Sequence, residues 1–246
     1  MKIILENITV SYRRFPAVHH ISATFQAGES WAICGPNGAG KSTLLQAIMG
    51  LTPVNSGRVT LNSMTLQDIA YMPQLSQIDR SQPLSVFELV AMGLWYEIGF
   101  FSGLSKTQKE RVYQALERVR MEMFAHRFIN ELSNGQFQRV LLARVLVQNA
   151  KFLLLDEPFN AIDEQTAHEL SNILDSCCQQ GQGVIAVLHN NDFVLRHFSH
   201  TLLMAREMIA SGKTHQVLTP EYLKRSALFR QDSIDEEAWC EEKEDA

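Results

Sequence analysis

The stretch "GPNGAGKST", residues 35–43, sets three glycines and a lysine directly before the apolar run "LLQAIMG". It matches the pattern G-x-x-x-x-G-K-[ST] of a loop that binds phosphate between a strand and a helix. The glycines let backbone N–H groups turn toward phosphate oxygens, and the helix N-terminus behind them adds a partial positive charge. We therefore expect a nucleotide phosphate at this loop, in contact with Gly35, Pro36, Asn37, Gly38, Ala39, Gly40, Lys41, Ser42 and Thr43.

Two side chains of this loop carry the chemistry that a bound triphosphate needs. Lys41 is expected to reach the β- and γ-phosphates, and the Ser42 hydroxyl is expected to help hold Mg²⁺. The alternative is a glycine-rich turn that arises by chance, which average composition predicts in roughly 1% of chains of this length. The predicted strand before the loop and the predicted helix 41–49 after it make that alternative rarer.

A second stretch, "FLLLDEP" at residues 152–158, delivers two acids at the end of a buried strand. Ligands of open α/β sheets bind at the carboxyl ends of the strands, so both acids are expected near the phosphate loop. Asp156 would hold the Mg²⁺ shell, and Glu157 would orient or deprotonate a water. Because adjacent strand side chains point to opposite sides, the turn at Pro158 must redirect Glu157. The alternative is an ordinary strand end with solvated acids.

The order of elements predicts an α/β fold. Expected strands lie at 4–12, 21–25, 29–35, 58–61, 69–72, 151–157, 183–189 and 201–205. From about residue 75 to 150 the pattern is helical, with helices at 85–94, at 106–119 and from near Ser133, and this stretch is interpreted as an inserted subdomain. Strands with all-apolar central runs, separated by helices, indicate a largely parallel sheet that is covered on both faces.

Charge is concentrated at the C-terminus. The net charge is −5 for 246 residues, but residues 232–246 hold eight acids and one lysine, a net of −7, so subtraction leaves +2 for residues 1–231. A nearly neutral body does not indicate a nucleic-acid surface. The segment 232–246 is expected to be an acidic, disordered tail.

The cysteines and the apolar runs indicate the compartment in which the chain is expected to act. Four cysteines stand at Cys34, Cys177, Cys178 and Cys240, in a spacing that fits neither a disulfide framework nor a zinc site, which favours a reducing compartment. The N-terminus is not typical of a signal peptide, and no apolar run approaches the ~18 residues that would span a membrane. Any membrane role is therefore expected to go through a partner.

The stretch "LSNGQFQRVLLARVLVQNAKFLLLDEP", residues 132–158, resembles the signature segment of ABC-type ATPases, and the resemblance extends over residues 3–228. It implies a P-loop NTPase fold of the ABC cassette type over residues 1–231. This fold has a RecA-like core, an antiparallel β subdomain and an inserted helical subdomain. It also implies ATP and Mg²⁺ as cofactors.

The resemblance assigns roles to residues outside the phosphate loop. Tyr12 would stack on adenine, although an edge-strand aromatic is the alternative. Gln74 would join the catalytic core to the helical subdomain and contribute to the Mg²⁺ shell. His189 would contact the γ-phosphate, while the other seven histidines are interpreted as surface residues without a role in the site. Asp163, in "NAID", would lie in a loop that crosses to a second subunit.

The start of the signature helix has its own physical pattern. Ser133 and Gln136 form the S-x-x-Q arrangement of a capping box, and a capped helix start is a site for an anion. The resemblance implies that Ser133, Gly135 and Gln136 meet the phosphate of a second copy, in a head-to-tail dimer that sandwiches two ATPs. The alternative is a cap with no ligand. Two positions depart from the family pattern: Asn134 replaces a usual glycine, and Asn190 replaces a common acid.

One cassette in one chain resembles a transporter subunit that docks on a separate permease. The stretch "QIDRSQPLSVFELVAMGLWYEIGFFSGLSKTQ", residues 77–108, and "VLTPEYLKRS", residues 217–226, resemble the zinc and manganese importer branch. The resemblance implies integral permease subunits and, indirectly, a metal-binding delivery protein as partners. It also implies a peripheral location on the cytoplasmic face of the inner membrane. The alternatives are an importer ATPase for iron-siderophore or vitamin and a non-transport ABC ATPase.

Overall fold

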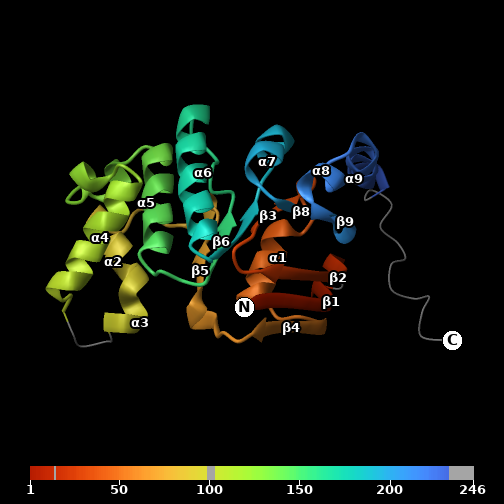
Figure 1. Ribbon diagram of the computed structural model, residues 1–246, viewed down its shortest axis with the longest axis horizontal. Coiled ribbons are helices and arrows are strands. Elements are labelled where there is room, and N and C mark those ends of the chain that lie inside the picture. The colour runs from red at the N-terminus through yellow and green to blue at the C-terminus, as the bar shows by residue number, and fades with distance from the viewer. Residues whose placement is uncertain (14, 99–102, 233–246) are drawn as a thin grey trace.

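A computed structural model describes residues 1–13, 15–98 and 103–232 (Figure 1). Its centre is a six-stranded sheet in the order β5-β6-β7-β3-β8-β9. The strands are β3 (Ser30–Cys34), β5 (Ile69–Met72), β6 (Phe152–Asp156), β7 (Gly183–Val187), β8 (His200–Ala205) and β9 (Glu207–Lys213). The first five run parallel, as the apolar runs predicted, and β9 pairs antiparallel with β8.

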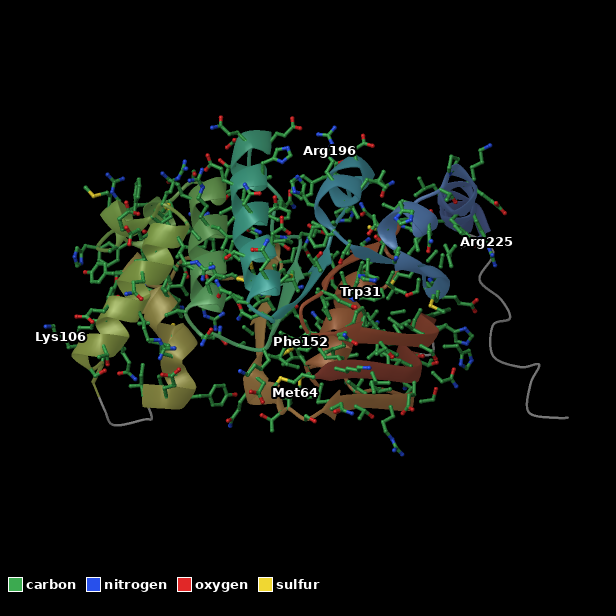
Figure 2. The ribbon with its side chains drawn as sticks, viewed as in Figure 1. Trp31, Met64, Lys106, Phe152, Arg196 and Arg225 are labelled. Atoms are coloured by element: carbon green, nitrogen blue, oxygen red, sulfur yellow. The ribbon has the colours of Figure 1, made fainter. Side chains whose placement is uncertain are left out.

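A second, antiparallel sheet has the order β2-β1-β4 and comprises β1 (Lys2–Tyr12), β2 (Phe15–Gln26) and β4 (Ser56–Asn62). Helix α1 (Lys41–Ile48) contacts β1 and β2 on one side and β6 on the other. Figure 2 marks Phe152 near the middle of the molecule, where it belongs to the core that joins the two sheets through α1. The phosphate loop therefore emerges from a buried strand and leads into a helix that packs against the core.

Among the described residues of the stretch that the sequence predicts as helical, the α-helices are α2 (Val86–Ala91), α3 (Trp95–Ile98), α4 (Lys106–Arg118) and α5 (Asn134–Leu146). Figure 1 shows them gathered at one end of the molecule, away from α8 and α9. Serines cap α2, α4 and α5 through capping boxes, as expected for Ser133. The segment 77–108 carries part of the metal-importer resemblance, and residues 99–102 of it lie outside the described residues.

The remaining helices are α6 (Glu164–Gln179), α7 (Asn191–His197), α8 (Thr214–Val217) and α9 (Pro220–Asp232). Short 3₁₀ turns lie at Leu66–Asp68, Leu75–Gln77, Met92–Leu94, Glu122–Phe124 and Ile129–Glu131. In the part of the chain that the structure describes, no helix is both long and apolar enough to cross a membrane. Of the acidic segment predicted at 232–246, only Asp232 is among the described residues.

Candidate nucleotide site

The phosphate loop connects β3 to α1 through glycines in left-handed backbone conformations. The φ angles are +150° at Gly35, +82° at Gly38 and +86° at Gly40. A Cβ atom on Gly35 would lie 2.0 Å from the Met204 carbonyl oxygen, and one on Gly40 would lie 2.0 Å from the Ala17 carbonyl oxygen. These two positions therefore need glycine both for their backbone angle and for the space beside them.

We expect Gly40→Ala to lower the free energy of unfolding by about 3 kcal/mol and Gly38→Ala by about 1 kcal/mol, measured by denaturant unfolding without nucleotide. Both glycines have nearly the same φ, but nothing lies within 4 Å of a Cβ on Gly38. The difference between the two variants therefore isolates the clash with strand β2. Equal losses of stability would show that the loop can move away from Ala17.

The Lys41 side chain is buried beneath the loop. Its Nζ atom donates hydrogen bonds to the carbonyl oxygens of Gly35, at 2.9 Å, and Pro36, at 2.8 Å. Burial lowers the pKa of Lys41 below its ordinary value, although the charges of Glu157, Cys34 and Asp156 act in the opposite direction. The loop thus holds an ammonium group at its inner side, where a phosphate can share its donors.

Asp156, the last residue of β6, faces the start of α1. Ser42 Oγ donates to Asp156 Oδ1 at 3.0 Å, and Asp156 is fully buried. Burial raises the pKa of Asp156, which the Ser42 hydrogen bond partly counteracts. Its Oδ2 atom has no hydrogen-bond partner among the described residues. A buried carboxylate oxygen without a partner, beside a hydroxyl, is an oxygen donor set that suits Mg²⁺.

Glu157 is redirected by the turn that follows β6, as the sequence predicted. Its φ angle is +54°, and its carboxylate makes three contacts. Glu157 Oε2 accepts from Gln74 Nε2 at 2.9 Å and from Asn160 Nδ2 at 3.1 Å, while Oε1 lies 2.7 Å from His189 Nε2. The turn thereby brings two residues that are distant in sequence, Gln74 and His189, and the nearby Asn160 to one carboxylate.

Opposing effects set the pKa of Glu157. Burial is the largest single effect and raises the pKa. The hydrogen bonds from His189, Gln74 and Asn160, together with the charge of His189, outweigh it, so the pKa lies below its ordinary value. The carboxylate is therefore ionised at neutral pH, which is the protonation state that a proton acceptor needs.

A cavity of about 660 Å³ opens over these groups. The predicted residues that line it are Asn37, Gly38, Ala39, Gly40, Lys41, Ser42, Thr43, Gln74, Glu157 and His189. Gly35, Pro36 and Asp156 do not line it but hydrogen-bond to Lys41 or Ser42, which do. The fold thus brings most of the predicted site together at the carboxyl ends of β3, β6 and β7.

Four further predicted residues, Tyr12, Ser133, Gly135 and Gln136, do not line this cavity either. Tyr12 ends β1 and is half exposed, opposite Phe15 in the register of the antiparallel sheet. Ser133, Gly135 and Gln136 lie at the start of α5, where Ser133 Oγ accepts from the Gln136 N–H at 3.2 Å and Gln136 Oε1 accepts from the Ser133 N–H at 3.0 Å. The capping box is therefore formed, on a helix end that lies outside the cavity of its own chain.

Sequence reasoning missed three residues around the site. Asn160 and Ala17 line the cavity, and Gln138 Nε2 donates to the Glu157 carbonyl oxygen at 2.8 Å from within α5. Gln138 is fully buried, and a glutamine among the apolar residues of α5 was a usable signal. Ala17 gives no such signal, because only the approach of β2 to the loop places it there.

The parallel sheet and the loop between β3 and α1 define a P-loop nucleotide-binding protein. The model of the ABC transporter family matches residues 18–160, which is more than half of the chain. The chain therefore belongs to the ABC transporter family, as its signature segment predicted.

Relatives and solved structures agree with this assignment. The chain is 36% identical to a manganese transport system ATP-binding protein of Listeria innocua over 89% of its length and 93% of the relative. It is 38% identical to a zinc transport system ATP-binding protein of Treponema pallidum over 90% of its length and 85% of the relative. An ABC transporter cassette in its ADP conformation superimposes with a TM-score of 0.79 at 25% identity, over 93% of this chain and 99% of the other. A dimeric cassette in a post-hydrolysis state with ADP and phosphate gives a TM-score of 0.76 at 26% identity, over 86% and 98%.

Proposed function

We propose that this chain is the ATP-hydrolysing subunit of an ABC importer that takes up a divalent transition metal, zinc or manganese, and converts ATP and water to ADP and phosphate. The proposal of ATP hydrolysis is supported chiefly by the position of the Glu157 carboxylate, which the turn after β6 directs into the cavity beside the phosphate loop. The metal part is supported by the names of two relatives that are similar over nearly the whole chain.

In this proposal the phosphate loop binds ATP and Lys41 neutralises charge on the β- and γ-phosphates. Tyr12 stacks on the adenine. The carboxylate of Glu157 takes a proton from water as the water oxygen bonds to the γ-phosphorus and the bond to the β–γ bridging oxygen breaks. His189, which lies 2.7 Å from Glu157, donates to the γ-phosphate. The support is that Lys41, Glu157 and His189 line one cavity.

Mg²⁺ fits the same site. We propose Ser42, Asp156 and Gln74 as the residues that hold it, because Asp156 Oδ2 is buried without a partner in the described part of the chain and Ser42 Oγ lies 3.0 Å from Oδ1. A bound Mg²⁺ would neutralise charge on the β- and γ-phosphates. Gln74 Nε2 donates to Glu157, so its amide oxygen is available to face a cation.

In this proposal a second copy of the chain completes the nucleotide site. Ser133, Gly135 and Gln136 do not line the cavity of their own chain, yet they form a capped helix start that suits a phosphate. We propose that they contact the γ-phosphate on a partner copy in a head-to-tail dimer with two ATPs. The existence of a dimeric, ADP- and phosphate-bound cassette of similar fold supports this arrangement.

The remaining partners follow from the proposed transport role. We propose a separate membrane permease with an associated metal-binding delivery protein, and a peripheral position on the cytoplasmic face of the inner membrane. Residues 1–231 form the ATPase domain in this proposal, with the helical subdomain at about 75–150 facing the permease. Among the described residues, no group of three or more His, Cys, Asp or Glu side chains could hold a metal ion. Selectivity for the cargo metal is therefore placed in the permease and the delivery protein.

A deletion strain grown in chelator tests the cargo. We expect poor growth that zinc or manganese, supplied singly in excess, restores, together with a loss of most of the chelator-resistant uptake of that metal, measured as cell metal content. A plasmid with the wild-type chain should restore uptake, and one with Lys41→Ala should not, because that variant lacks the phosphate countercharge. Unchanged metal content, with a defect in siderophore or vitamin uptake instead, would contradict the metal assignment and leave the ATPase assignment standing.

A further inference from the structure

Arg80 connects the segment that follows Gln74 to the loop that enters α5. Its Nη1 atom donates to Asn134 Oδ1 at 3.0 Å. Its Nη2 atom donates to the carbonyl oxygens of Ile129, at 2.9 Å, and Leu132. The guanidinium carbon also lies 4.6 Å from the centre of the Phe137 ring. One side chain thus contacts the start of the 3₁₀ turn, the residue before the cap, and the first turn of α5.

The contacts of Arg80 converge on the helix start that we propose to face a partner's phosphate. Leu132 immediately precedes the capping residue Ser133, and Asn134 is the first residue of α5. Guanidinium groups hold carbonyl oxygens in a fixed plane, because their N–H groups form a rigid fork. Arg80 therefore holds the loop that leads into this helix start, and it places a positive charge beside a helix end that attracts anions.

The structure assigns a positioning role to Arg80: it orients the start of α5 toward the phosphate of the nucleotide held by a second copy of this chain. The Asn134 side chain belongs to the same arrangement, because its Oδ1 atom accepts a hydrogen bond from Arg80. This inference rests on the proposed function.

Arg80 is not needed to form the helix itself. The capping box of Ser133 and Gln136 initiates α5, and buried residues such as Phe137 and Leu141 anchor it in the core. Loss of Arg80 should therefore leave the fold and the chain's own nucleotide cavity intact, while the loop from Ile129 to Asn134 loses its fixed direction. The defect should appear only when a second copy has to engage the loop.

Dimer formation separates these two effects. In chains that carry Glu157→Gln, so that bound ATP persists, the dissociation constant of the dimer is measured with Mg²⁺-ATP by analytical ultracentrifugation. Arg80→Gln should weaken the dimer about tenfold, because it removes charge-assisted hydrogen bonds. ATP binding by the monomer, measured by calorimetry below the dimer-forming concentration, should change less than about twofold. Asn134→Ala, which removes one of the contacts, should weaken the dimer to a smaller extent.

Arg127→Gln is the matched control, because Arg127 is an arginine in the same helical region whose described cation–π contact is with Phe124. It should leave the dimer constant unchanged. Dimers of Arg80→Gln as strong as those of the control would overturn the inference, and so would a parallel loss of monomer ATP affinity, which indicates a general structural defect. Should Arg80→Gln not fold, an unweakened Asn134→Ala dimer overturns it instead. Absence of any ATP-dependent dimer in the Glu157→Gln parent would overturn the proposed head-to-tail dimer, and this inference with it.

Discussion

The Glu157→Gln chain should bind ATP as the wild-type chain does and lose nearly all ATP turnover. Glutamine keeps the shape of the side chain and an oxygen that can accept from Gln74 or Asn160, as Oε2 does now. It cannot accept the proton of an attacking water, however, and the loss of a positioned base typically costs about 10²–10⁴-fold in rate. Phosphate release by the purified chain with Mg²⁺-ATP measures this effect, and calorimetry measures the retained affinity.

Glu117→Gln provides the control for this variant, because Glu117 is an exposed acid on α4. Its turnover should equal that of the wild-type chain. Normal phosphate release by Glu157→Gln would remove Glu157 from the chemistry, and a reduced ATP affinity with normal turnover would place it in binding instead.

The Lys41→Ala chain should lose ATP affinity itself, by about a hundredfold or more, because removal of one partner from a desolvated, hydrogen-bonded charge pair is costly. Lys41 is buried, and its ammonium group bonds to two carbonyl oxygens of the loop that surrounds the proposed phosphate. Calorimetric titration with ATP gives the affinity, and the melting temperature without nucleotide shows that the fold survives.

Lys106→Ala serves as the control for the loss of a lysine, since Lys106 is exposed at the start of α4 and far from the phosphate loop (Figure 2). It should bind ATP with wild-type affinity. If Lys41→Ala also bound ATP with wild-type affinity, the assignment of the loop as a phosphate site would be wrong.

Local patterns in the sequence were sufficient to predict that the phosphate loop and the acids at the end of β6 lie close together. The phosphate loop and the strand that ends at Asp156 each carry their chemistry within a few consecutive residues, so the parallel sheet around them could be predicted as well. Strand β9 and the first half of β2, from Phe15 to His20, were not predicted. Both depend on pairing with a neighbouring strand, which a short polar or mixed sequence does not reveal.

The contacts around Glu157 show the same limit. The resemblance named Gln74 and His189, but the bond from Gln138 in α5 to the Glu157 carbonyl oxygen depends on how the helical region packs against the sheet. Arg80 is a further case, because its partners Ile129, Leu132 and Asn134 lie about fifty residues away in sequence. Roles that need a second copy, such as those of Ser133 and Gly135, stay predictions.

The head-to-tail ATP sandwich is tested most directly by native mass spectrometry of the Glu157→Gln chain with Mg²⁺-ATP. We expect a species that contains two chains and two ATP molecules, because each nucleotide is held between the phosphate loop of one copy and the start of α5 of the other. A corresponding species with two chains and two ADP molecules should be absent from samples with ADP, because ADP lacks the γ-phosphate that α5 would contact. The proposed arrangement would be contradicted by a chain that remains a monomer with one ATP at protein concentrations well above the dissociation constant of a stable dimer.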